Sequence, residues 1–178
     1  MKNKKQKDSI LSWMGVLLAA IIIAALIRTF VFSATIVLGE SMNPTLLEND
    51  RLIALKVPLY YRGPHRGDIV ILQAPDEEKT EYVKRVVGLP GETVSISNGT
   101  LYIDGKKFEE DYISTEYTEI YVEDTWVLEE DEYFVLGDNR LPGKSLDSRF
   151  FGPIKKNTID GIITLRYWPV SRLNGGKL

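Results

Sequence analysis

Two short motifs place a reactive side chain among turn and strand residues. In residues 39–44 (GESMNP), Ser41 follows an apolar strand pattern and precedes a turn restricted by proline. In residues 81–91 (EYVKRVVGLPG), Lys84 and Arg85 are neighbours within an apolar run. Adjacent strand residues point to opposite faces, so one of these cations must face the more buried side. A buried lysine loses hydration, its pKa falls, and its neutral amine can act as a general base.

Taken alone, these motifs are better explained by a surface serine and a solvent-exposed lysine on an edge strand. A third motif, residues 137–152 (GDNRLPGKSLDSRFFG), is a polar loop after another apolar strand pattern. In this loop we expect Asp138 to pair with Arg140, and Asp147 with Arg149. A fourth, residues 66–68 (RGD), reads as a turn that enters a strand.

Composition excludes several other chemistries. The chain has no cysteine, so disulfides, thiolate metal sites and a cysteine nucleophile are excluded. Its one histidine, His65, stands between a proline and an arginine, which disfavours an imidazolium and a Ser–His–Asp triad. One histidine also makes a zinc site improbable, and we expect neither metal nor cofactor. The net charge of −3 argues against a nucleic-acid partner.

The N-terminal segment has the pattern of a membrane anchor. Residues 1–9 are basic, residues 10–27 carry no charge, and residues 30–32 continue the apolar run after Arg28. The window 10–32 is long enough to span a bilayer and exceeds the apolar region of most cleaved signal peptides, the competing interpretation. The positive-inside rule then places residues 1–9 in the cytoplasm and residues 33–178 on the extracytoplasmic side of the cell membrane.

The remainder reads as a mainly β, antiparallel sheet or barrel-like domain, because short β-branched and aromatic runs alternate with turn signals. Asn98-Gly99 and Asp104-Gly105 predict tight two-residue hairpins. The acid-rich residues 108–132 are interpreted as a solvated loop. Strands are expected at residues 35–38, 51–57, 68–73, 82–87, 93–97, 100–103, 125–128, 133–136 and 162–167, and no convincing amphipathic helix follows residue 33.

In combination, these motifs resemble a known family. A basic start and one span are followed, in order, by SMNPTL (41–46), RGDIV (66–70), YVKRVVGLPGE (82–92), GDNR (137–140), SLDSR (145–149) and FGP (151–153). Nearly the whole chain is thereby similar to the type I signal peptidases, in the short single-anchor form typical of Gram-positive bacteria. The resemblance implies an all-β catalytic domain at the membrane surface.

The resemblance also implies a role for each matching residue. Ser41 matches the nucleophile, whose backbone N–H forms part of the oxyanion hole, and Lys84 matches the general base. Ser145 matches a hydroxyl that orients the lysine. Asp147 and Arg149 match residues that brace the site, and Met42, Tyr82 and Val83 match positions near pockets for small substrate side chains. The implied partners are preproteins with Ala-x-Ala-like cleavage sites, membrane lipid and the protein export machinery.

Two departures from the family pattern stand out. Gly39 occupies a position where some members have a serine that helps hold the oxyanion. Four residues, LPGK (141–144), separate GDNR from SLDSR where two are usual, so the flanks of this turn have to stay in place for Ser145 to keep its role. The alternatives are a Ser–Lys protease specialised for another exported substrate and a non-catalytic, membrane-tethered β domain that binds partners.

Overall fold

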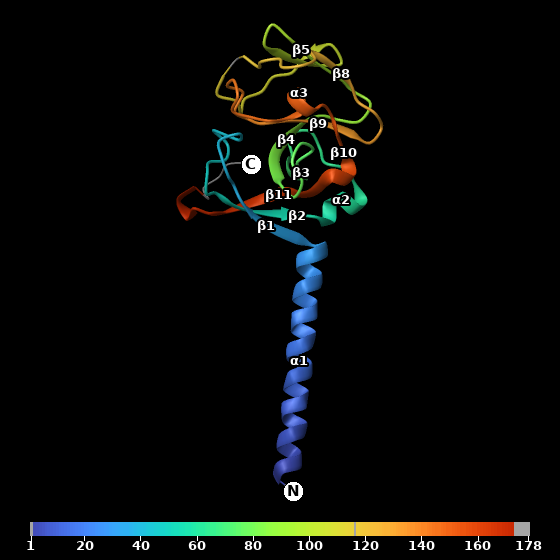
Figure 1. Ribbon diagram of the computed structural model, residues 1–178, viewed down its shortest axis with the longest axis vertical. Coiled ribbons are helices and arrows are strands. Elements are labelled where there is room, and N and C mark those ends of the chain that lie inside the picture. Colours follow the sequence, from blue (N-terminus) through green and yellow to red (C-terminus); the bar gives the residue numbers. More distant parts are fainter. Residues whose placement is uncertain (1, 116, 173–178) are drawn as a thin grey trace.

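The computed structural model describes residues 2–115 and 117–172. Helix α1 (Lys2–Phe30) projects away from a β-rich body that contains the rest of the described chain (Figure 1). Its segment Trp13–Phe30 is unburied and long and apolar enough to cross a membrane. This arrangement confirms the expected mainly β fold with one N-terminal apolar helix.

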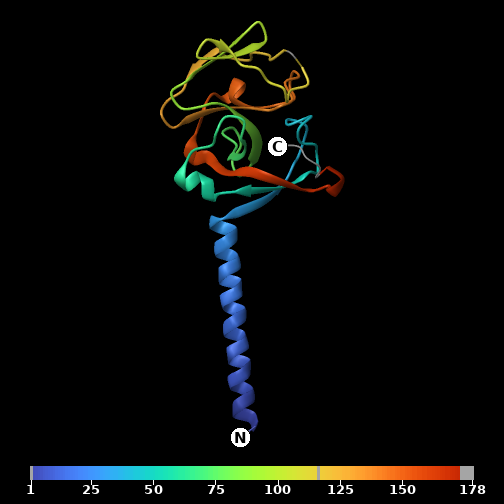
Figure 2. The ribbon, with the colours of Figure 1, turned by 180° about the vertical axis from the view of Figure 1, so that it is seen from behind.

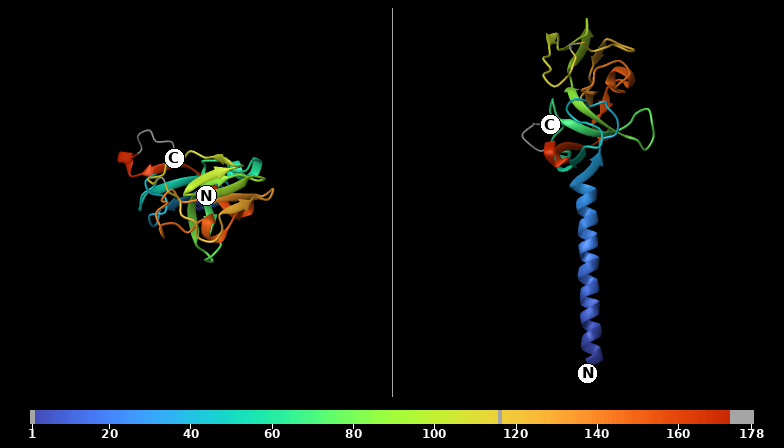
Figure 3. Two further views of the ribbon diagram at one scale, coloured as in Figure 1. Left: turned by 90° about the horizontal axis from the view of Figure 1, so that it is seen from above. Right: turned by 90° about the vertical axis from the view of Figure 1, so that its left-hand side faces the viewer.

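Two antiparallel sheets make up the body. In the larger, the strand order is β1-β2-β11-β3-β4-β9-β10, and in the smaller it is β7-β6-β5-β8. The views in Figures 2 and 3 agree that β1, β2 and β11 lie next to α1, whereas the smaller sheet lies at the far end. The strands are β1 (Phe32–Ile36), β2 (Arg51–Leu55), β3 (Ile69–Gln73), β4 (Glu81–Gly88), β5 (Thr93–Ser97), β6 (Thr100–Ile103), β7 (Lys106–Lys107), β8 (Thr125–Val127), β9 (Glu132–Leu136), β10 (Ile154–Lys155) and β11 (Ile159–Trp168).

The core of the larger sheet is built on both faces of β3. Ile69 and Ile71 pack into one buried cluster, which also contains Met42. Val70 and Leu72 pack into another, with residues of β9 and β11. Because side chains alternate along a strand, a strand buried on both faces reads as a continuous apolar run. The neighbouring strand β4, which carries Lys84, is therefore held against a rigid centre.

The tight turns form where the sequence predicts them. Asn98 and Gly99 both have positive φ values, 49° and 77°, and join β5 to β6. Asp104 and Gly105, at 50° and 73°, join β6 to β7. These are the left-handed conformations that a two-residue hairpin of type I′ requires.

Two strand predictions and the absence of later helices need correction. The strand expected over residues 51–57 ends at Leu55, and the chain continues into the short helix α2 (Val57–Tyr61). Pro58 lies in its first turn, where proline's fixed φ and missing N–H are tolerated. The strand expected over residues 35–38 instead forms earlier, as β1. The other short helices are α3 (Ser148–Phe151) and the 3₁₀ turns η1 (Lys156–Thr158) and η2 (Val170–Arg172).

Candidate active site

The fold brings Ser41 and Lys84 into contact across 43 residues of sequence. Lys84 lies within β4, and Ser41 lies in the turn region that follows β1. Lys84 Nζ donates to Ser41 Oγ over 3.0 Å and to the Val83 carbonyl over 3.2 Å. Lys84 is only 3% exposed, while Ser41 is half-buried. A half-buried serine hydroxyl thus meets a buried amine, one arrangement that can activate a serine as a nucleophile.

The surroundings of Lys84 lower its pKa and so raise the fraction of neutral amine. Burial lowers the pKa of Lys84 from 10.5 to about 8, because desolvation disfavours the ammonium form. The negative charge of Asp147 opposes this shift, and the positive charge of Arg149 adds to it. Consequently, an appreciable fraction of Lys84 is deprotonated near neutral pH and can accept a proton.

A cleft of about 390 Å³ opens directly onto these two residues. Met42, Tyr82 and Val83, the residues expected near the substrate pockets, all line it. Met42 is nevertheless 1% exposed, so it forms the floor of the cleft rather than its rim. Strand residues of β1 and β4 both contribute to its lining, which comprises Thr35, Ile36, Val37, Leu38, Ser41, Met42, Lys79, Thr80, Glu81, Tyr82, Val83 and Lys84.

The expected ion pairs of the loop over residues 137–149 are half right. Asp147 pairs with Arg149, Oδ2 to Nη2 2.7 Å, as the sequence predicted. The predicted pairing of Asp138 with Arg140 is wrong. Asp138 instead forms a bidentate pair with Arg85 of β4, at 2.9 and 2.7 Å, and Arg140 pairs with Glu110.

Arg140 pairs with Glu110 and not with Asp138 because other hydrogen bonds fix the position of its guanidinium group. Its Nε donates to the Gly137 carbonyl over 2.8 Å, and Nη1 donates to Glu110 and Thr118. Glu110 is almost fully buried, although it lies in the acid-rich segment interpreted as a solvated loop. From sequence alone, Glu110 could not be distinguished from the other acidic residues around it. It could have been found only from the argument that a buried Arg140 needs a carboxylate partner.

Arg85 and Asp138 anchor the same loop to β4. Asp138→Ala is expected to lower the free energy of unfolding by about 3–5 kcal/mol, because it leaves the buried Arg85 guanidinium without its carboxylate. Denaturant unfolding of the purified protein measures this loss. The exposed pair of Lys107 with Glu109 provides the control, and Glu109→Ala should change stability by less than about 1 kcal/mol. Equal losses in the two variants would contradict a special contribution of the buried pair.

Asp147 forms the buried centre of the loop. Its carboxylate is fully buried and accepts hydrogen bonds from Gly137 N–H and from Arg149. Burial by itself would raise the pKa of Asp147, but the hydrogen bonds and charge of Arg149 outweigh burial, and the pKa lies below its usual range. Arg149 also packs over the Tyr121 ring, 5.1 Å from its centroid. Asp147 therefore stays ionised and supplies a fixed negative charge near Lys84.

Contacts that the sequence did not reveal tie this loop to the nucleophile. The Asn139 backbone N–H donates to the Ser41 carbonyl and its side-chain amide to the Glu40 carbonyl, each over 3.0 Å. Lys144, in the lengthened turn, pairs with the Glu40 carboxylate at 2.8 Å. The turn over residues 141–144 thus remains attached beside Ser41. Such partners lie about 100 residues away in sequence, where local patterns carry no signal.

Ser145 and Gly137 complete the site. A Cβ built on Gly137 would lie 2.3 Å from Ser145 Oγ and 2.4 Å from the Ser41 carbonyl oxygen, so this glycine separates the two serines. The buried Ser145 hydroxyl has no hydrogen-bond partner of good geometry within the described residues, although it lies close enough to Asp147 to help lower its pKa. Its contact with Lys84 stays a prediction.

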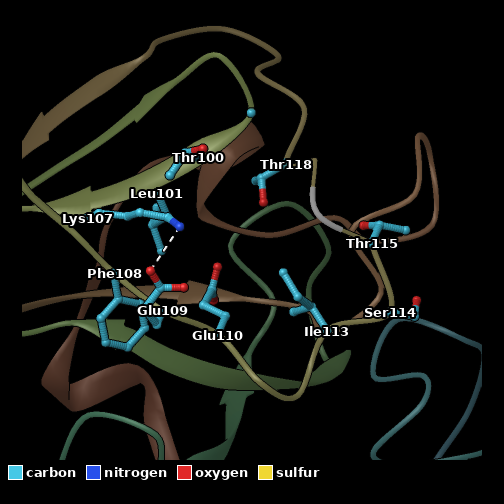
Figure 4. A pocket seen from close by; sticks show the side chains of 11 residues that line it. Thr100, Leu101, Lys107, Phe108, Glu109, Glu110, Ile113, Ser114, Thr115 and Thr118 are labelled. Atoms are coloured by element: carbon cyan, nitrogen blue, oxygen red, sulfur yellow. Dashed lines mark ion pairs between the residues drawn. The ribbon is translucent and has the colours of Figure 1, made fainter.

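Other features lie outside this constellation. His65 is an exposed residue of the loop before β3. A larger cavity of about 580 Å³ borders the smaller sheet (Figure 4), and Lys107 and Glu109 form an ion pair beside it. It shares no lining residue with the cleft at Ser41. We therefore place the candidate active site at the cleft that Ser41 and Lys84 share.

Comparison with known proteins identifies the family of the chain. The family model described as "Signal peptidase, peptidase S26" matches residues 10–168. The chain is 39% identical to signal peptidase I P of Bacillus subtilis subsp. natto, over 99% of this chain and 98% of that protein. It is also 39% identical to signal peptidase I of Leptolyngbya laminosa, over 86% and 77%.

A solved structure shares the fold. The crystal structure of a signal peptidase I from Enterococcus faecalis V583 aligns with a TM-score of 0.50 and 36% sequence identity, over 58% of this chain and 98% of that chain. The family model, the curated relatives and the solved structure point the same way. The chain belongs to the signal peptidases of the S26 family of serine peptidases, which remove signal peptides from preproteins.

Proposed function

We propose that this chain is a membrane-anchored endopeptidase that removes signal peptides with Ser41 as nucleophile and Lys84 as general base. The observation that carries the proposal is the 3.0 Å contact between Lys84 Nζ and Ser41 Oγ, made by a lysine that is almost completely buried. A lysine so placed combines two requirements of a general base, hydrogen-bond reach and a pKa near the working pH.

In the proposed reaction, Ser41 Oγ attacks the carbonyl carbon of the scissile peptide bond while Lys84 Nζ takes its proton. The tetrahedral oxyanion is held by backbone donors that include the Ser41 N–H. Lys84 then gives the proton to the leaving amine, and the carbon–nitrogen bond breaks to leave an acyl ester on Ser41. Lys84 next removes a proton from water, whose attack on the ester releases the signal peptide and restores the hydroxyl.

We propose that the cleft selects small substrate side chains in an extended peptide. Residues 35–36 of β1 and residues 81–84 of β4 line the cleft as extended backbone, beside which a peptide can lie. The buried Met42 closes the floor of the cleft and limits the depth available to a side chain. Both features support cleavage after Ala-x-Ala-like sequences, with Met42, Tyr82 and Val83 in contact with substrate and Ser145, Asp147 and Arg149 positioning Lys84.

We further propose that α1 anchors the protein with residues 1–9 in the cytoplasm, 10–32 in the membrane and 33–178 on the extracytoplasmic side. The lysines at positions 2, 4, 5 and 7, before the apolar span, support this orientation. The cleft would then face the compartment into which preproteins emerge, near the membrane and the export machinery.

The pH dependence of cleavage tests the role of Lys84. Because the neutral amine is the active form and its pKa is about 8, kcat/KM should rise with pH up to about 8 and then level off. About a tenth of Lys84 is neutral at pH 7, so the rate should increase nearly tenfold between pH 6 and 7. Stopped-flow or discontinuous assays on a peptide substrate measure this profile. A midpoint near 6.5 would indicate a histidine base instead.

The function itself is tested with a preprotein carrying alanine at both specificity positions and a matched one carrying leucine there. The detergent-solubilised protein should convert the first into mature protein and leave the second intact. Sequencing the mature N-terminus identifies the bond cut. Cleavage of both substrates alike would contradict the proposed specificity, and cleavage of neither by a folded protein would favour a specialised substrate or a non-catalytic role.

A further inference from the structure

A third cavity, of about 620 Å³, lies where α1 meets the β body. Thr29 and Phe30, the last residues of α1, form one side of it, and α2, η1 and the start of β11 contribute others. It shares no lining residue with the cleft at Ser41 and Lys84. The proposed reaction therefore does not account for this cavity.

If α1 spans a membrane as proposed above, the contact of the cavity with the end of α1 determines how far the cavity lies from the centre of the bilayer. Residues 10–32, the span proposed above, cross the ~30 Å hydrocarbon layer of a bilayer. Helix α1 ends at Phe30, two residues before the extracytoplasmic end of this span, and Phe30 forms part of the wall of the cavity. The cavity therefore opens in the layer that contains the phospholipid headgroups.

Three of the four charged side chains that line the cavity have no ion-pair or hydrogen-bond partner within the described residues, namely Lys56, Lys156 and Asp160. Lys56 and Lys156 are half-buried, and neither ammonium forms an ion pair within the described residues. Asp160 is also half-buried, and its carboxylate accepts no hydrogen bond from the described chain. Asp131 meets only the exposed Lys155, at 4.0 Å. Partly desolvated charges of both signs favour a ligand that carries an anion and a cation together.

An apolar part of the lining completes the site. Leu59 and Tyr60 of α2, together with Phe30, present apolar surface beside the charged groups. Phe30 is 53% exposed and Tyr60 is 59% exposed. A ligand with methylene groups attached to its charged part can cover this surface, and a small free ion cannot.

We propose that this cavity binds a phospholipid whose headgroup carries both a phosphate and an ammonium group. Lys56 and Lys156 would hold the phosphate, and Asp160 and Asp131 would hold the ammonium. The glycerol and the first methylenes would lie on Phe30 and Tyr60, with the acyl chains continuing into the bilayer beside α1. Such a lipid would join the anchor to the catalytic body without entering the cleft.

The test uses the full chain in detergent micelles, with native mass spectrometry of bound lipid. Phosphatidylethanolamine, which has both charges, should bind at least about tenfold more tightly than phosphatidylglycerol, which lacks the ammonium group. The double variant Lys56→Ala with Lys156→Ala should lose this binding, and Lys106→Ala, on the distant β7, should retain it. Asp160→Asn should weaken phosphatidylethanolamine binding while leaving that of phosphatidylglycerol unchanged.

Several outcomes would overturn the proposal. Equal binding of both lipids, or a preference for phosphatidylglycerol, would refute the proposal that Asp160 and Asp131 bind an ammonium group. Binding of soluble glycerophosphoethanolamine as tight as that of the lipid would identify a free phosphoester as the ligand.

Cleavage of a short peptide, measured on the same samples, separates this proposal from the proposed function. The Lys56/Lys156 double variant should cleave at the wild-type rate in detergent, because neither lysine lines the cleft. Selective lipid binding by a chain that cleaves nothing would refute the proposed function alone, and cleavage without selective binding would refute the lipid site alone.

Discussion

Replacing Lys84 with methionine is expected to lower kcat/KM by on the order of 10²–10⁴-fold, the contribution typical of a general base. Methionine keeps the length and apolar stem of the lysine but cannot accept the proton of Ser41. Ser41→Ala should leave even less activity, because it removes the atom that forms the acyl ester. Cleavage of a preprotein, followed by sequencing of the mature N-terminus, measures both effects.

The same Lys84→Met variant should be more stable than the wild type at pH 7. The pKa of Lys84 is about 8 in the folded protein and near 10.5 when unfolded, so folding buries a charge at every pH below 8. The wild type recovers this cost as pH rises from 8 to 10.5, where the unfolded chain binds more protons. We expect a gain of on the order of 2–3 kcal/mol for the variant at pH 7.

Lys106→Met, at an exposed position of β7, is the matched control and should change neither activity nor stability appreciably. Loss of activity together with loss of stability in Lys84→Met would indicate a structural role for the lysine. Activity that survives Lys84→Met would refute the Ser–Lys pair and return attention to His65.

Gly137→Ala is expected to have the second large effect, a fall in kcat/KM of about a hundredfold or more. The new Cβ would lie 2.4 Å from the Ser41 carbonyl oxygen, which is backbone and cannot turn away. The nucleophile loop has to shift, and a misplacement of about 1 Å can cost 10²-fold in rate. Overpacking should also lower stability by about 1–3 kcal/mol. Activity assays and thermal unfolding on the same preparation measure both.

Gly88→Ala is a control for Gly137→Ala, because it distinguishes a displaced active site from a general loss of stability. A Cβ there would lie 2.6 Å from Val94 and 2.8 Å from Leu128, within the core of the smaller sheet. This variant should be destabilised, yet its folded fraction should cleave at close to the wild-type rate. Gly15→Ala, with nothing within 4 Å in α1, should affect neither property. A Gly137→Ala variant no slower than Gly88→Ala would contradict the role assigned to Gly137.

Local rules predicted the parts of the fold that depend on neighbouring residues. Asn98-Gly99 predicts a hairpin because only a few residue types tolerate the conformation it needs, and no distant partner is involved. Likewise, the apolar run of residues 69–72 predicts a buried strand. The change from β2 to α2 escaped prediction because the five-residue helix is too short to show a periodic pattern.

The site could be predicted only through the combined motifs. Nothing local marks Ser41 as the partner of Lys84, since their contact depends on how β1 and β4 are arranged in the larger sheet. The predicted pairing of Asp138 with Arg140 rests on their closeness in sequence. It is wrong because Arg85 of β4 forms a bidentate ion pair with Asp138. The buried Glu110 illustrates the same limit, because burial depends on the packing of distant segments.

A single residue, Val31, separates α1 from β1. Its N–H donates to the Ile27 carbonyl of the helix over 2.8 Å, and its carbonyl accepts from Lys56 N–H over 2.9 Å. Because hydrogen bonds hold both the N–H and the carbonyl of Val31, we expect this link to resist bending between α1 and β1. If α1 spans the membrane as proposed above, this link would keep Ser41 at one height above the bilayer. Substrates would then be measured by the number of residues between their own membrane-embedded segment and the bond to be cut.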